Sequence, residues 1–99
     1  MNALVVFENL QWVQIASGMR CKTFSSDKKT IRLIELTEGF ADSDWCEKSH
    51  TNYILEGEFS LDFFDEQTRI KKGDTVYIPE GHKHKAILGK DERVLMLDF

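Results

Sequence analysis

Short runs of branched and aromatic residues, separated by turn-forming residues, extend along almost the whole chain. Such runs are expected to form β-strands at residues 18–24, 30–36, 52–64, 75–78, 84–88 and 93–99. In Phe59, Leu61 and Phe63 the apolar side chains alternate with polar ones, which is the period of a strand with one buried face. Residues 7–15 fit a helical turn or a strand equally well. Strands this numerous and closely spaced predict an all-β, antiparallel barrel or sandwich, an arrangement that removes exposed strand edges.

Composition narrows the class of protein without identifying its function. The 99 residues fit one domain, expected to span residues 1–99, and contain no apolar run long enough to cross a bilayer. The net charge of −4 argues against nucleic acid or an anionic membrane as a partner. Residues 3–7 are apolar but lack the basic flank of a signal peptide. The two cysteines, Cys21 and Cys46, are too few for a disulfide framework. We therefore expect a reduced, cytoplasmic protein.

Residues 73–84, GDTVYIPEGHKH, place a glycine, a strand, a proline and a histidine at defined intervals. Gly73 can take the positive φ of a tight turn, and the β-branched and aromatic residues 75–78 favour a strand. Pro79 cannot donate a ladder hydrogen bond, so it ends that strand, and Pro-x-Gly forces a turn before His84. The spacing G-x5-P-x-G-x2-H resembles the second conserved motif of the cupin superfamily. This resemblance implies a double-stranded β-helix (jelly-roll) barrel, with His84 as a metal ligand inside it.

The first cupin motif, G-x5-H-x-H-x3,4-E-x6-G, is matched only in part. Gly57, within YILEGEF, corresponds to its closing glycine. His50 then takes the glutamate position, while Asp44 and Cys46 take the positions of the two histidines. Gly39 lies one residue closer than the opening glycine of the pattern. The ligand set that the resemblance implies is Asp44, Cys46, His50 and His84.

This set is chemically able to bind a metal. Asp44 and Cys46 are two residues apart, so on a strand their side chains would share one face. Carboxylate oxygen, thiolate sulfur and imidazole nitrogen together suit zinc, iron, nickel or cobalt, and do not suit magnesium or calcium. Four protein ligands around a tetrahedral ion would close the site, whereas three would leave a position open for a substrate.

A metal-free interpretation stays open beside this one. Asp44-Trp45 also resembles a branch of small cupins related to ethanolamine-utilisation and ureidoglycine-processing proteins, in which the first-motif histidines are often replaced. Cys46 could be a small buried apolar residue, and Asp44 could cap the turn after Gly39. His82 is expected at the rim of the barrel, away from the ligands.

Two functions follow from these alternatives. The first is a metal-dependent enzyme acting on a small polar metabolite such as a sugar acid or keto acid, with the metal as a Lewis acid or as an orienting group. The second is a non-catalytic module, with or without metal, that binds or senses a small ligand. We expect a small-molecule-binding cupin with a divalent transition metal inside the barrel, and the sequence leaves catalysis undecided because a fold does not determine an activity.

The chain is rich in apolar residues near both ends, at residues 4–7 and at Leu95, Met96, Leu97 and Phe99. On a small barrel, alternate residues of a terminal strand must point outward. A twofold interface would cover them together with open strand edges, so we expect a homodimer. The alternative is that these ends fold back over their own barrel.

Overall fold

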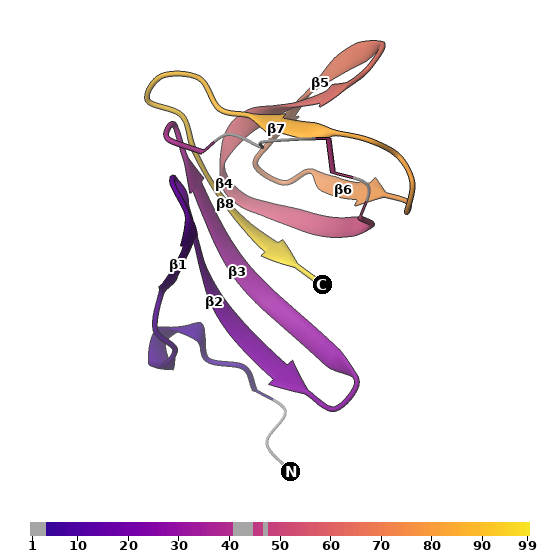
Figure 1. Cartoon of the computed structure of the whole chain (residues 1–99). Coiled ribbons are helices and arrows are strands. Elements are labelled where there is room, and N and C mark those ends of the chain that lie inside the picture. The colour runs from indigo at the N-terminus through magenta and orange to yellow at the C-terminus, as the bar shows by residue number, and fades with distance from the viewer. Residues whose placement is uncertain (1–3, 41–44, 47) are drawn as a thin grey trace.

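The structure is a computed structural model and describes residues 4–40, 45, 46 and 48–99. It consists almost entirely of antiparallel strands, which confirms the predicted all-β barrel (Figure 1). A single 3-10 turn, η1 (Phe7–Asn9), precedes them. The strands are β1 (Val13–Ala16), β2 (Met19–Ser26), β3 (Lys29–Thr37), β4 (His50–Phe63), β5 (Glu66–Lys71), β6 (Thr75–Ile78), β7 (Lys85–Ile87) and β8 (Arg93–Asp98). In the described part of the chain, no helix has the length and hydrophobicity needed to cross a membrane.

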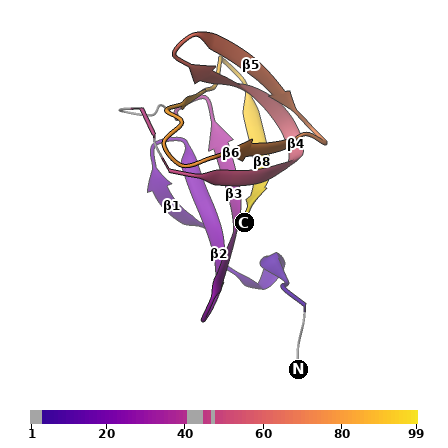
Figure 2. The ribbon, with the colours of Figure 1, turned by 90° about the vertical axis from the view of Figure 1, so that its right-hand side faces the viewer.

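The strand order is β1-β2-β3-β8-β4-β5, and β6 and β7 both pair with β4. The first half of β4 lies between β8 and β6, and its second half lies between β5 and β7. One long strand therefore belongs to both walls of the barrel. Figure 2 shows β4, β5 and β6 curving around one end of the barrel, while the β2–β3 hairpin projects from the other end.

Strand β4 can serve both walls because it bends at Gly57. The pairing register with β8 shifts between Ile54 and Glu56, which marks a bulge. Gly57 follows with φ of 81°, and a Cβ built there would lie 1.8 Å from the backbone oxygen of Arg93. A glycine is required here by its backbone angle and by the close approach of β8. Gly73 also has a positive φ, 90°, as predicted, but a Cβ there would meet nothing within 4 Å.

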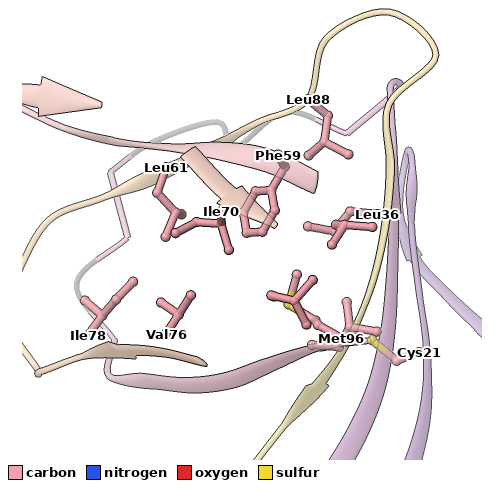
Figure 3. Close-up of a cluster of buried hydrophobic side chains, with 12 residues drawn as sticks. Cys21, Leu36, Phe59, Leu61, Ile70, Val76, Ile78, Leu88 and Met96 are labelled. Carbon is pink, nitrogen blue, oxygen red and sulfur yellow. The ribbon is translucent and has the colours of Figure 1, made fainter. Parts of the chain in front are cut away.

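The core lies inside the barrel and is built from the inward-facing positions of most of its strands. Figure 3 shows Val76 and Ile78 on one side of the interior, facing Phe59, Leu61 and Ile70 on the other. The buried set is Cys21, Ile34, Leu36, Ile54, Phe59, Leu61, Ile70, Val76, Ile78, Leu88, Val94 and Met96. Phe59, Leu61 and Phe63 were predicted as core residues from their alternation along the strand. Phe59 and Leu61 are buried, and Phe63 is partly buried and packs against the core.

One buried carboxylate is held by arginines of two neighbouring strands. Glu35 of β3 is 7% exposed. It accepts a hydrogen bond from Arg20 Nε at 2.7 Å and forms an ion pair with Arg93 at 2.6 Å. The Arg20 hydrogen bond lowers the pKa of Glu35, burial opposes this, and Arg93 lowers it further. Since both arginines satisfy the carboxylate, this cluster ties β2, β3 and β8 together.

The structure adds detail that the sequence did not provide. Residues 7–15, which fitted a turn or a strand, divide into η1 and the start of β1. Strand β5 was not predicted, because Ile70 is its single buried residue and the rest of its side chains are exposed. Met96, at the apolar C-terminal end of the chain, is buried in the barrel core.

Candidate metal centre

Cys46 and His84 are held opposite each other by a two-residue antiparallel bridge. Cys46 N–H donates to the His84 carbonyl at 2.9 Å, and His84 N–H donates back to the Cys46 carbonyl at 3.1 Å. The turn at Pro79 and Gly81 delivers His84 to this position just before β7. Because both backbone bonds are closed, the thiol and the imidazole leave the main chain side by side.

His50 completes a group of three potential metal ligands. It is the first residue of β4 and pairs with Ile78 of β6. Its Nε2 atom lies 3.6 Å from Cys46 Sγ, and its ring centroid lies 5.0 Å from that of His84. One ligand atom from each of Cys46, His50 and His84 lies within 4.8 Å of the other two. His84 is 4% exposed, whereas the side chain of His50 is 32% exposed, so the group lies between core and solvent.

These separations fit a tetrahedral ion with a mixed sulfur and nitrogen shell. Zinc binds nitrogen at about 2.0–2.1 Å and sulfur at about 2.3 Å, which places two such ligands about 3.6 Å apart. The distance between Cys46 Sγ and His50 Nε2 has this value, 3.6 Å. With all three ligand atoms within 4.8 Å of one another, closing the group around an ion needs shifts of about 1 Å. The three residues together can therefore hold a divalent transition metal.

The orientation of His84 is fixed by a backbone acceptor. Its Nδ1 atom lies 2.8 Å from the carbonyl oxygen of His82. A carbonyl only accepts, so Nδ1 carries the proton and the Nε2 lone pair is left available for a ligand. Metal-binding histidines commonly use their second nitrogen in this way, and such outer contacts orient the ring.

His50 has a carboxylate behind it. Asp98 Oδ1 of β8 lies 3.9 Å from His50 Nδ1, which is too long for a direct hydrogen bond but close enough for an ion pair. Asp98 raises the pKa of His50, burial opposes this rise, and Cys46 adds to it. The carboxylate is itself held in place, because Asn52 Nδ2 donates to Oδ1 at 3.0 Å and Arg32 lies 3.7 Å from Oδ2. Asp98 thus approaches Nδ1 of His50, while Cys46 approaches Nε2.

The three potential ligands line a cavity in the barrel interior. Its volume is about 170 Å³, and most of its lining is apolar. The apolar lining residues are Met19, Ile34, Leu36, Phe40, Phe59, Leu61, Ile78, Ala86 and Met96. The polar ones are Cys46, His50, Asn52 and His84. The cavity therefore has one face able to bind metal and walls of hydrocarbon.

Comparison with known proteins identifies the family. Residues 42–99 match the family model described as Cupin domain. This chain belongs to the cupin family. No curated protein matches the sequence.

Several solved structures superpose on almost the whole chain. The polyketide cyclase RemF from Streptomyces resistomycificus has a TM-score of 0.81 at 18% identity, covering 99% of this chain and 78% of that one. KdgF from Halomonas sp. has a TM-score of 0.74 at 17% identity, covering 99% and 94%. A putative ethanolamine utilization protein from Salmonella typhimurium LT2 has a TM-score of 0.71 at 13% identity, covering 97% and 84%. At these identities the likeness shows the fold alone.

Three of the four ligand candidates predicted for this cupin lie together. Cys46, His50 and His84 form the group described above, and Asp44 lies outside the described residues. His82 is exposed, as expected of a rim residue, and its carbonyl contributes to the site through His84.

Trp45 takes no part in the group of potential ligands. Its ring stacks on Phe64 at 4.2 Å. Neighbouring residues of an extended segment point in opposite directions, so Trp45 packs on Phe64 while Cys46 lines the cavity.

Sequence reasoning did not find Asp98 or assign a role to Asn52. Asn52 lies two residues after His50 on β4, so their shared face was visible in the sequence. Asp98 reaches the site only because β8 pairs with β4, with Asp98 directly opposite Asn52. That register depends on the closed barrel and has no local signal.

Proposed function

We propose that this cupin holds a divalent transition metal on Cys46, His50 and His84 and presents it to a small molecule in the barrel cavity. The observation that carries the proposal is the convergence of three ligand atoms, within 4.8 Å of one another, on the wall of the cavity. Sulfur and nitrogen donors favour zinc, iron, cobalt or nickel. Around a tetrahedral ion these three protein ligands leave one coordination position, for Asp44 or for a substrate, and the bound ion would supply Lewis-acid chemistry.

The protein residues have separate tasks in this proposal. Cys46 and His84 are fixed by their backbone bridge, and the His82 carbonyl keeps the proton of His84 on Nδ1. Asp98 favours positive charge on His50. A thiolate ligand needs reducing conditions, and both cysteines are free, which supports a cytoplasmic location. The apolar walls exclude water from the inner part of the cavity.

Elemental analysis of protein purified without an affinity tag tests this proposal. We expect close to one transition metal per chain in the wild-type protein, and a loss of that metal in His84→Ala. The fold should survive in this variant, because the backbone bridge and the apolar core do not depend on the imidazole. His82→Ala is the matched control: this ring lies two residues away and is exposed, so its removal should leave metal content unchanged.

The outcomes test the metal centre on which the first of the two functions depends. Metal content near zero in wild-type protein, even after incubation with zinc or cobalt in reducing buffer, would reject the metal centre. A non-catalytic, metal-free ligand-binding role would then be favoured, since the cavity exists independently of the ion. Retention of the metal in His84→Ala would show that the ion binds elsewhere, and equal loss in His82→Ala would show that the loss does not depend on the His84 imidazole.

A further inference from the structure

We infer that the ligand of this cavity is a compact molecule with an apolar body, about one ring in size, and a single oxygen-bearing head group that binds the metal. This inference rests on the proposed function, because the head group needs the ion held by Cys46, His50 and His84. It narrows the ligand class: aromatic keto acids, enols and hydroxamates fit the description, whereas sugars do not.

Polarity in the cavity is confined to one region. Among the described lining residues, the polar ones are the three potential ligands and Asn52, which lies two residues from His50 on β4. Two of their polar groups are already engaged: the Asn52 amide donates to Asp98, and His84 Nδ1 faces the His82 carbonyl. The remaining wall offers hydrocarbon and the thioethers of two methionines. A ligand can therefore form strong polar contacts only at the metal-binding face.

The desolvation of a ligand decides which class binds. A hydroxyl placed against Leu61, Ile78 or Met96 would give up its hydrogen bonds to water and receive none in return, which is unfavourable. A sugar carries such hydroxyls on every side, so most of them would be left unpaired. An aromatic or aliphatic body instead gains from leaving water. The same wall that rejects a sugar thus favours an apolar group.

The volume sets the size of the apolar body. An apolar cavity of about 150 Å³ lined by leucine, isoleucine and phenylalanine accommodates benzene. The cavity here has about 170 Å³ and a lining of the same kind. One ring fits this space.

Ala86 keeps part of this space open. It lies on β7, two residues after His84, and pairs with Leu61 of the neighbouring strand β4. It is the smallest side chain of the lining. A larger residue here would extend toward the space beside the metal-binding face. We therefore assign Ala86 as a residue that determines ligand size.

Two hydroxamates that share a head group and differ in their body test the inference. Cobalt(II)-loaded protein is titrated with acetohydroxamate and with benzohydroxamate, using calorimetry for affinity and the visible spectrum for coordination of the ion. We expect both to change the spectrum and benzohydroxamate to bind about 10- to 100-fold tighter, because its ring leaves water. Equal affinities, or tighter binding of acetohydroxamate, would overturn the inference and leave the metal centre intact. Failure to bind cobalt would overturn the proposed function as well.

Variants locate the ring. In Ala86→Leu the preference for benzohydroxamate should fall at least fivefold while acetohydroxamate still binds, and Ala86→Val provides a smaller step should the first variant be unstable. Ile87→Leu, at the next position and 39% exposed, is the matched control and should keep the wild-type preference. A preference that survives in both Ala86 variants would show that the ring lies outside the cavity.

Discussion

Replacing Asp98 with asparagine is expected to weaken metal binding by about 10- to 100-fold. The change keeps the size of the side chain and its acceptor for Asn52, and removes the negative charge that faces His50 and Arg32. When His50 binds an ion, its ring gains positive charge, which the carboxylate 3.9 Å from Nδ1 stabilises. Asparagine cannot do this.

The magnitude follows from the distance and the exposure of the pair. Opposite unit charges 3.9 Å apart attract by about 1 kcal/mol in water and by about 4 kcal/mol at an effective dielectric constant of about 20. The His50 and Asp98 side chains are 32% and 20% exposed, so the pair lies between these limits. A 10- to 100-fold change corresponds to about 1.4–2.8 kcal/mol, within this interval.

The assay is a competition for zinc between the protein and a chromophoric chelator at pH 8. A proton on His50 competes with the metal, and Asp98 raises the pKa of His50, so an alkaline pH reduces this competition. Glu58→Gln is the control, since it changes the net charge equally at a carboxylate that is 56% exposed and paired with Arg69. If Asp98→Asn binds zinc within twofold of wild type, the carboxylate does not support His50.

Other predictions concern stability and association. Glu35→Gln should lower the free energy of unfolding by about 1–3 kcal/mol at pH 7. Because the pKa of Glu35 is lowered, its stabilisation is present above the ordinary carboxyl range and is lost as pH falls through the lowered value. The urea unfolding curves of variant and wild type should therefore converge in acid, and a difference that stays constant with pH would contradict this. In urea unfolding, Gly73→Ala should lower the free energy of unfolding by about 1–2 kcal/mol because of its positive φ. Gly57→Ala should lower it by more than about 3 kcal/mol, because its Cβ also meets β8. Equal losses would show that β4 adjusts freely. Light scattering of the predicted homodimer should give twice the 11.5 kDa monomer mass. Val13→Lys and Ile15→Lys should dissociate it, because these residues are 58% and 57% exposed on edge strand β1. A monomer mass that holds as concentration rises would refute the dimer.

Features governed by local sequence were predictable. The alternation of Phe59 and Leu61 revealed a buried face, because the period of a strand is visible in a few residues. The turn at Pro79 and the glycine at position 73 were predictable because their backbone requirements are met by few other residues. Strand β5 lacked such a signal: its exposed polar side chains resemble a loop, and it is a strand because β4 offers it a partner.

Contacts between distant strands were not predictable from one sequence. Motif spacing pointed to His50 and His84 as partners across 34 positions of the chain, because the family resemblance carries three-dimensional information. Nothing comparable pointed to Asp98, whose place beside His50 depends on the pairing of β8 with β4. The burial of Glu35 has the same origin, since its two arginines come from strands on either side of β3.

The bend in β4 connects the metal-binding face to the apolar wall. His50 and Asn52 precede the bulge and face the cavity from one sheet, while Phe59 and Leu61 follow Gly57 and face it from the other. A straight strand of this length would carry the second pair away from the first. The glycine that tolerates the close approach of β8 therefore also allows one strand to supply both a metal ligand and the hydrocarbon surface beside it. This arrangement confines polar recognition to one end of the cavity and leaves the selection of the ligand body to shape and desolvation.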